Sequence, residues 1–263
     1  EIDPNAIDSD EEDLIPREEV VITITKDNYI KRIPLRTYKQ QGRGGVGLIG
    51  MQTKEEDDVA NMFVTCTHDY IMFITNTGRL HWLKGYKIPE GSRQSKGKPI
   101  VNMLPDLEDG EKVVNTISVS EFTDDKALVF CTKSGIIKKT ILSAYGNIRS
   151  RGIKAIKLEE GDELISTGIT DDTNEIVIAT KHGQAARFDE FEVRATGRDT
   201  MGVKGITLSS DDEVVGMTIV KPEDMILSVS ENGFGKISVV DEYRKTHRGS
   251  KGVITMKTTE RNG

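Results

Sequence analysis

The 263-residue chain carries 36 Lys and Arg against 43 Asp and Glu, a formal net charge of −7, and 36% of its residues are hydrophobic. Its two cysteines, Cys66 and Cys131, stand in apolar runs without a C-x-x-C spacing, which argues against a disulfide framework or a zinc site. No apolar run approaches 18 residues and no basic-then-apolar leader occurs. We therefore expect no membrane span and no signal peptide, and the free thiols fit a reducing cytoplasm.

The first part of the chain is strongly acidic. Residues 1–20 contain nine Asp and Glu but a single basic residue, Arg17. We expect residues 1–17 to form a solvated linker or arm, although such a segment could instead lie over a basic face and compete with a polyanion. Residues 18–263 are expected to form one repeat domain.

From Val20 onward, a pattern of strand, tight turn and strand recurs five times. The first copy runs from residues 20–25 through a turn at 26–28 to residues 29–33. The first strand of each hairpin is almost continuously apolar, which predicts burial on both faces, whereas the second mixes apolar and basic residues, which predicts a half-exposed strand. The turns of the later copies each contain a glycine suited to a positive φ: Gly78, Gly135, Gly183 and Gly233.

Each hairpin is followed by a basic stretch and a glycine that opens a short apolar segment. These glycines are 52, 55, 50 and 50 residues apart: Gly45, Gly97, Gly152, Gly202 and Gly252. An acidic turn, which we interpret as solvated, and a further apolar strand follow the first four. Four strands per unit of about 50 residues predict an all-β, propeller-like array of blades. The fifth copy stops in its acidic turn at residue 263, so we expect that a sixth blade is cut away or that strands from both ends close the ring.

The cations gather in repeat-equivalent stretches. Five windows hold 30 of the 36 Lys and Arg but only 9 of the 43 Asp and Glu, a net charge of +21, and the other residues sum to −28: residues 26–51, 76–104, 133–158, 181–208 and 231–258. Equivalent loops of a repeat lie on one side, so we predict one basic and one acidic surface. A curved row of cations would bind DNA phosphates without reading sequence.

We predict DNA contacts in all five repeats, with the fourth the weakest because Asp189, Glu190, Glu192 and Asp199 interrupt its cations. The predicted contacts are Lys31, Arg32, Arg36, Lys39, Arg43, Arg79, Lys84, Arg93, Lys96, Lys98, Lys138, Lys139, Arg149, Arg151, Lys154, Arg187, Arg194, Arg198, Lys204, Lys236, Arg244, Lys245, Arg248 and Lys251.

Other side chains are assigned structural roles. Five aromatic residues near the ends of the hairpins are expected to pack blade on blade rather than stack on bases: Tyr38, Tyr86, Tyr145, Phe191 and Tyr243. The four histidines lack ligand spacing, and no nucleophile elbow, P-loop or metal-binding carboxylate set occurs. We therefore predict no catalytic residue, metal site or cofactor.

One glycine-rich loop contains the first of the periodic glycines, Gly45: Gln41, Gly42, Arg43, Gly44, Gly45, Val46 and Gly47. With the basic hairpins and blades of about 50 residues, it makes residues from about 18 to 263 closely resemble the C-terminal domain of the bacterial DNA gyrase A protein. That family's signature loop, the gyrase A box, reads Gln-basic-Arg-Gly-Gly-basic-Gly. This chain matches it at five positions, and Gly42 and Val46 replace two usual cations.

The resemblance implies a β-pinwheel, a propeller-like disc usually of six blades whose basic rim wraps double-stranded DNA and supports negative supercoiling. It also implies an isolated domain that is monomeric and, in the ATP-dependent type IIA topoisomerase, partners in the N-terminal region of gyrase A and in gyrase B. The catalytic region would lie outside this chain, and the complex would act at the bacterial nucleoid in the cytoplasm. Two alternatives stay open: the corresponding C-terminal DNA-binding domain of topoisomerase IV, and a propeller scaffold for protein partners.

Overall fold

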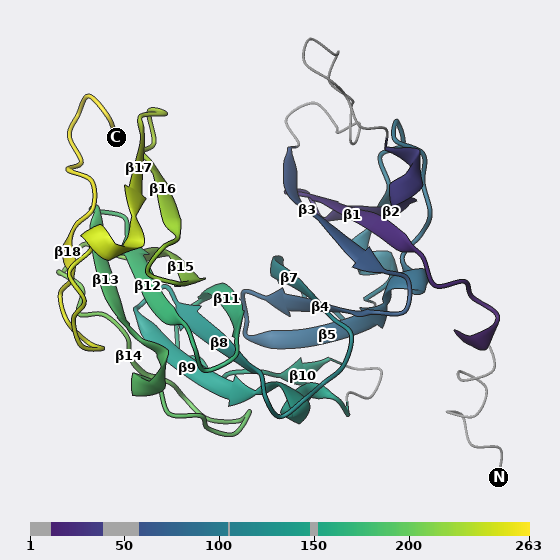
Figure 1. Ribbon diagram of the computed structural model, residues 1–263, viewed down its shortest axis with the longest axis horizontal. Coiled ribbons are helices and arrows are strands. Elements are labelled where there is room, and N and C mark those ends of the chain that lie inside the picture. The colour runs from purple at the N-terminus through teal and green to yellow at the C-terminus, as the bar shows by residue number, and fades with distance from the viewer. Residues whose placement is uncertain (1–11, 39–57, 105, 148–151) are drawn as a thin grey trace. The chain divides into compact units, whose positions relative to one another are not determined.

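The computed structural model describes residues 12–38, 58–104, 106–147 and 152–263, and strands with short 3-10 helices make up nearly all of their regular structure (Figure 1). Among these residues, no helix has the length and apolar character needed to cross a membrane. The all-β prediction is confirmed.

The five predicted hairpins are present. Their turn glycines have φ between 76° and 86°, and Asn28, which takes this place in the first hairpin, has φ 60°. The hairpins are β1 (Glu19–Thr25) with β2 (Tyr29–Pro34), β4 (Tyr70–Thr75) with β5 (Arg79–Lys84), β8 (Ala127–Thr132) with β9 (Ile136–Ile141), β12 (Glu175–Thr180) with β13 (Gln184–Asp189), and β16 (Met225–Val229) with β17 (Gly235–Val239).

Two further kinds of strand complete the sheets. The long ones are β3 (Val59–Cys66), β7 (Val113–Val119), β11 (Leu164–Thr170) and β15 (Val214–Val220), and the two-residue ones are β6 (Lys98–Pro99), β10 (Ile153–Lys154), β14 (Val203–Lys204) and β18 (Val253–Ile254). The 3-10 helices are η1 (Leu35–Thr37), η2 (Gly85–Lys87), η3 (Ile100–Asn102), η4 (Leu142–Tyr145), η5 (Glu190–Glu192) and η6 (Val240–Glu242).

The strand order differs from a simple succession of blades. The sheets run β3-β1-β2-β6, β10-β5-β4-β7, β11-β8-β9-β14 and β15-β12-β13-β18, and within the described part of the chain β16 pairs with β17 alone. Each short strand therefore pairs with the hairpin of the preceding repeat: Lys98 lies opposite Ile30 of β2, although β4 and β5 come between them in the chain. Residues 76–104, which the sequence groups as one repeat, are therefore divided between two sheets.

We use the term return segments for the stretches that run back to the preceding hairpin and end in these short strands. Their described residues are 88–99, 146–147 with 152–154, 193–204 and 243–254. The second strand of a hairpin has an edge of unpaired N–H and C=O groups, and the return segment supplies partners for that edge. The path from β13 through η5 to β14, and from β17 through η6 to β18, can be followed in Figure 1.

The chain divides into two compact units, Glu1–Phe73 with His81–Glu121, and Ile74–Leu80 with Phe122–Gly263. Each has its own apolar core. In the first, Ile22 of β1, Phe73 of β4 and Ile100 of η3 are fully buried in one cluster. In the second, residues of β8, β9, β12 and β13 pack with Ile206, which follows β14. A buried side chain of this size stabilises the fold by about 1.5–3 kcal/mol.

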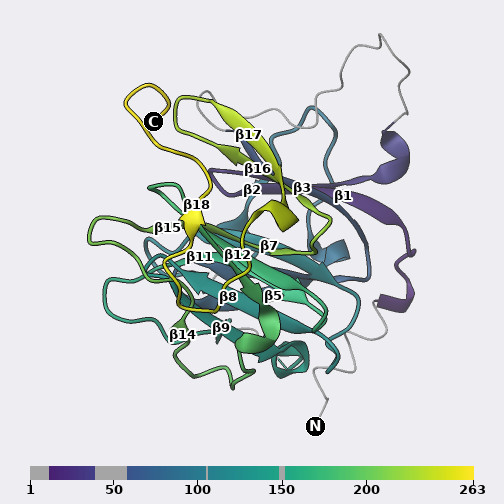
Figure 2. The same cartoon turned by 60° about the vertical axis from the view of Figure 1, so that its left-hand side comes forward.

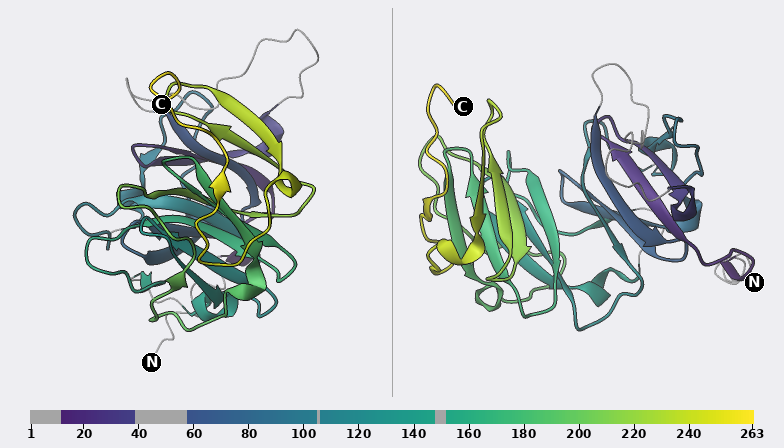
Figure 3. Two further views of the ribbon diagram at one scale, coloured as in Figure 1. Left: turned by 90° about the vertical axis from the view of Figure 1, so that its left-hand side faces the viewer. Right: turned by 45° about the horizontal axis from the view of Figure 1, so that its top comes forward.

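The prediction of a half-exposed second strand was wrong for three hairpins. Most residues of β2, β9 and β13 are buried, because a return segment covers each of them. The β16–β17 hairpin shows the contrast, since this two-stranded sheet leaves Leu227 63% and Ile237 65% exposed (Figures 2 and 3). These three second strands are thus more buried than β17, which has no return segment among the described residues.

The acidic turns are more than solvated connections. In one of them, Asp212 Oδ1 accepts hydrogen bonds from the backbone N–H groups of His182 (2.9 Å) and Glu213 (3.0 Å), and its Oδ2 accepts one from Thr180 Oγ1 (2.6 Å). Asp162 makes the equivalent bond to the backbone N–H of Ser134 (3.0 Å). One carboxylate in each of these two turns therefore caps the tip of the preceding hairpin.

We predict that Asp212→Ala lowers the free energy of unfolding by about 1–3 kcal/mol, because three donors lose their charged acceptor. Chemical denaturation followed by circular dichroism measures the change. The exposed neighbour provides the control, and Asp211→Ala should leave the unfolding midpoint nearly unchanged. Equal effects of the two substitutions would contradict the capping role.

Candidate nucleic-acid interface

The return segments are fixed at both ends by equivalent backbone contacts. Near the start of three of them lies a parallel bridge to the second strand of the preceding hairpin, as between Lys139 and Ala195. At the end of all four, an N–H group donates to a turn carbonyl at 2.8 Å, as Gly205 does to Gly135 and Ile100 does to Asn28. The described residues between the two ends face solvent in part, so each return segment displays side chains there.

Most of the exposed cations among the predicted contacts lie on these return segments. The exposed ones are Lys96, Lys98, Lys154, Arg194, Lys204, Arg244, Lys245 and Lys251 on return segments, with Arg36 on η1 and Lys236 on β17. Arg79, Arg93, Arg198 and Arg248 are partly exposed. Lys39, Arg43, Arg149 and Arg151, together with the whole Gln41–Gly47 loop, lie outside the described residues.

The cations in the middle of the second strands have a different environment. Lys31, Lys138, Lys139 and Arg187 are at most 5% exposed, and the side chain of Arg32 is 16% exposed. A duplex cannot reach the four most buried groups, so we remove these four from the set of phosphate contacts. The sequence did not distinguish these buried cations from exposed ones, because Lys or Arg has the same place in the repeat pattern in both environments.

Arg187 shows how such a charge is accommodated. Its guanidinium donates to Glu175, to the carbonyl of Val240 (3.1 Å) and to the carbonyl of Tyr243 (2.9 Å). Glu175 also pairs with Lys245 Nζ at 2.7 Å. A buried ion pair requires such complete hydrogen bonding, because the partners have lost their hydration. Arg187 and Lys245 are therefore joined to an internal carboxylate.

Residues 12–18 contact two of the predicted cations. Glu12 pairs with Lys84 Nζ (3.0 Å) and with His68 Nδ1 (3.2 Å), and Glu18 pairs with Arg36 (2.5 Å). The backbone carbonyl of Ile15 lies 2.7 Å from the other ring nitrogen of His68. Glu12, Ile15 and Glu18 therefore make contacts within the first unit, and residues 1–11 of the predicted linker or arm lie outside the described residues.

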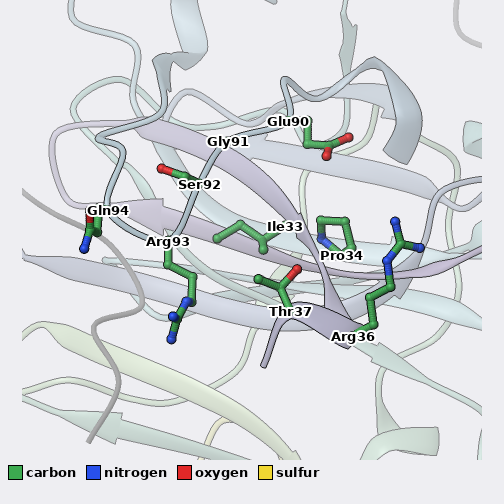
Figure 4. A pocket seen from close by; sticks show the side chains of 9 residues that line it. All are labelled: Ile33, Pro34, Arg36, Thr37, Glu90, Gly91, Ser92, Arg93 and Gln94. Carbon is green, nitrogen blue, oxygen red and sulfur yellow. The ribbon is translucent and has the colours of Figure 1, made fainter. Parts of the chain in front are cut away.

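Arg36 and Arg93 border one hollow of about 710 Å³ (Figure 4). Arg36 comes from η1 and Arg93 from the first return segment, and Figure 4 shows their guanidinium groups apart and pointing in different directions. Ser92 and Gln94 also line the hollow and were not predicted, although their polar run between two apolar stretches marks a surface loop. The Glu90 carboxylate lines the hollow as well, and Arg36 pairs with Glu18, so the hollow carries groups of both charges.

The aromatic residues divide by their place around the 3-10 helices. Tyr145 and Tyr243, at the ends of η4 and η6, are buried, and the Tyr145 hydroxyl lies 3.3 Å from the carbonyl of Ala155. Val193 takes this position in the fourth repeat, whereas Phe191 lies two residues earlier and is 74% exposed. Val193 therefore takes the packing role that was expected of Phe191, and the expected burial of Phe191 is contradicted. Tyr38 and Tyr86 are half-buried.

Three of the acids expected to weaken the fourth repeat are engaged within the protein. Asp189 pairs with Lys245 at 2.6 Å, and Glu192 accepts the backbone N–H of Arg248 at 2.9 Å. Glu190 is 1% exposed and lies 3.7 Å from Lys139. Burial, together with the neighbouring Asp172 carboxylate, raises the pKa of Glu190 to about 7. These three carboxylates therefore serve mainly to hold the return segment against the rest of the protein.

Comparison with known proteins agrees with this architecture. The family described as "DNA gyrase C-terminal domain, beta-propeller" matches residues 19–66, 69–120, 126–171, 174–221 and 224–263. The chain is 47% identical over 259 residues to the DNA gyrase A protein of Staphylococcus aureus, covering 97% of this chain and 29% of that protein.

Two solved structures extend the comparison. The C-terminal domain of DNA topoisomerase IV has a TM-score of 0.78 at 28% identity, covering 95% of this chain and 76% of that one. A DNA gyrase A C-terminal domain has a TM-score of 0.74 at 30% identity, covering 94% and 80%. The predicted β-pinwheel is thereby confirmed.

We predict that Glu190→Gln flattens the pH dependence of stability. Because the pKa of Glu190 is raised on folding, its contribution is favourable below its unfolded pKa and is lost as pH rises through about 7. The wild type should lose about 1–2 kcal/mol more than the variant between pH 5 and pH 8. Urea unfolding at the two pH values measures this, with exposed Glu160→Gln as control. Parallel profiles for wild type and Glu190→Gln would contradict the assignment.

Proposed function

The chain belongs to the family of DNA gyrase C-terminal domains, and from this premise we propose that it binds double-stranded DNA and wraps it without reading base sequence. The observation that supports the proposal most strongly is the recurrence of exposed Lys and Arg on return segments that share one backbone geometry. Repeated contacts of this kind neutralise phosphates at regular intervals and release counterions.

Wrapping needs enough contacts to offset the cost of bending. Smoothly bending 20–30 base pairs by 40–90° costs on the order of 1–6 kcal/mol. Each return segment offers at least one exposed cation, such as Lys98, Lys154, Lys204 and Lys251. Contacts distributed over several repeats can hold a bent duplex because each acts on the backbone alone, as in other wrapped complexes.

The chain spans 29% of the length of the gyrase A protein that it matches. We infer that it acts as the DNA-wrapping part of an ATP-dependent type IIA topoisomerase whose cleavage and ATPase chemistry lies in other segments. Its partners would then be the N-terminal region of gyrase A and the gyrase B protein, and its place the nucleoid of a bacterial cytoplasm. The wrap would give the enzyme its negative-supercoiling activity.

Topoisomerase IV is the second candidate. Its C-terminal domain superposes at a TM-score of 0.78, and Gly42 and Val46 depart from the full gyrase box. Identity favours gyrase, at 47% to the gyrase A protein against 28% to the topoisomerase IV domain. Plasmid ligated in the presence of the domain separates the two, because a gyrase-type wrap leaves a linking change of fixed sign.

We predict that log affinity for duplex DNA falls steeply and linearly with log salt concentration. The double variant Lys96→Ala with Lys98→Ala should reduce the magnitude of this slope by about 2, since each phosphate contact contributes about 0.9. Fluorescence anisotropy with a duplex of about 40 base pairs measures the slope. Lys126→Ala with Lys221→Ala removes two exposed lysines outside the predicted set and should keep the wild-type slope. A flat wild-type response would exclude phosphate-driven binding.

For the glycine-rich loop, Arg43→Ala is expected to impair wrapping more than simple binding. Flanking glycines allow backbone N–H groups to approach a phosphate closely, so the loop can clamp a duplex that the other cations merely attract. Linking change in ligated plasmid reports wrapping, and anisotropy with a short duplex reports binding. Equal loss in the two assays would mean that Arg43 is one phosphate contact among many.

A further inference from the structure

Two lysines at the same position of their hairpins, Lys31 in β2 and Lys138 in β9, are buried beneath return segments. We propose that their ammonium groups are positioning groups. They fix the conformation of the return segments by binding backbone carbonyls, and they thereby fix the positions of the exposed cations that contact DNA. This inference rests on the proposed function for its DNA consequence, whereas the holding contact itself can be tested without DNA.

The contact is complete at Lys31. Its side chain is fully buried, and Nζ lies 2.9 Å from each of three backbone carbonyl oxygens, those of Ser92, Arg93 and Ser95. An ammonium group has three N–H donors, so every donor has an acceptor. Three carbonyl groups of the return segment therefore surround the ammonium nitrogen, as carbonyl ligands surround a bound cation.

The residues that touch the lysine stem also fit this arrangement. A Cβ atom built on Gly91 would lie 3.3 Å from Lys31 Cδ and 2.6 Å from Ser95 Oγ. Glycine therefore lets the return segment close over the aliphatic stem. The ammonium binds the carbonyl of Arg93, which borders the hollow of Figure 4, and that of Ser95, which directly precedes the exposed Lys96.

Lys138 repeats the contact in the second unit. Its Nζ donates to the carbonyl of Ala155 (2.7 Å) and to that of Arg198 on the return segment. Burial lowers the pKa of Lys138 to about 8, with Asp199 opposing and Arg198 reinforcing the shift. Burial of the Lys138 ammonium thus has an electrostatic cost. The bond to the Arg198 carbonyl fixes the backbone of this residue, which is another predicted DNA contact.

The repeats that differ support the same interpretation. In the fourth hairpin Ala186 takes the position, and there the adjacent Arg187 binds the carbonyls of Val240 and Tyr243, just before the return segment and at its first residue. In the fifth, Lys236 takes it and is exposed, on a sheet that has no return segment among the described residues. Burial of the lysine thus accompanies a covering segment, and an internal cation contacts that part of the chain in each of these three covered hairpins.

The direct test is hydrogen exchange of the full 263-residue chain carrying Lys31→Met, which keeps the stem and removes the ammonium. Amides of residues 91–98 should exchange at least about tenfold faster than in the wild type, while those of β8 and β9 in the other unit keep their wild-type rates. Lys126→Met makes the same charge change at an exposed site and should leave residues 91–98 protected. Unchanged exchange in Lys31→Met would overturn the proposal.

A second variant covers the case in which Lys31→Met loosens the whole first unit. Lys31→Ala leaves space for a small cation, so added ethylammonium should restore protection of residues 91–98, whereas equal tetramethylammonium, which has no N–H donor, should not. Equal effects of the two salts would overturn the proposal.

The DNA consequence is measured in the same variants. Lys31→Met should reduce the magnitude of the salt slope by about 2, through misplacement of Arg93 and Lys96, and Lys126→Met should not. A wild-type slope in a Lys31→Met chain whose loop exchanges fast would refute the positioning role. Absence of DNA binding by the wild type would refute the proposed function and leave the exchange result to stand by itself.

Discussion

The structure depends on the pairing of one strand edge. The second strand of each hairpin carries N–H and C=O groups that its own hairpin cannot satisfy, and in four sheets a short strand of two residues from the following repeat supplies the partners. The bond from Gly205 to the carbonyl of Gly135 has counterparts of equal length in the other three sheets. Each of these repeats is thereby completed by the next one, and in three of them a basic stretch of chain is carried back over a largely buried strand.

This exchange divides the cations into two groups. Those in the middle of β2, β9 and β13, such as Lys138 and Arg187, become interior groups that bind carbonyls or carboxylates. Those on the return segments, such as Lys98 and Lys204, remain in solvent. The high content of Lys and Arg therefore has two physical uses: internal cations fix the backbone, and surface cations remain available to phosphates.

Much of this architecture could be predicted from the sequence. The apolar first strands, the turn glycines and the period of about 50 residues identify the hairpins and the class of fold, because these signals are local. The exchange of strands could not be predicted, since pairing Lys98 with its own hairpin or with the preceding one satisfies the same periodicity. The burial of Lys31 follows from that exchange of strands. It could not be predicted, because an exposed lysine would give the same alternation of apolar and basic residues. The exposure of Phe191 was missed because the aromatic pattern shifts by two residues in that repeat.

We propose that DNA lies along the return segments rather than on the strands. Acetylation of lysines in the free and DNA-bound chain, quantified by mass spectrometry, is the decisive measurement. Duplex DNA is expected to protect Lys96, Lys98, Lys154, Lys204 and Lys251 and to leave Lys126 and Lys221 as reactive as before, with Lys31 and Lys138 unreactive in both states. Protection confined to one repeat, or equal protection of Lys126 and Lys221, would contradict it.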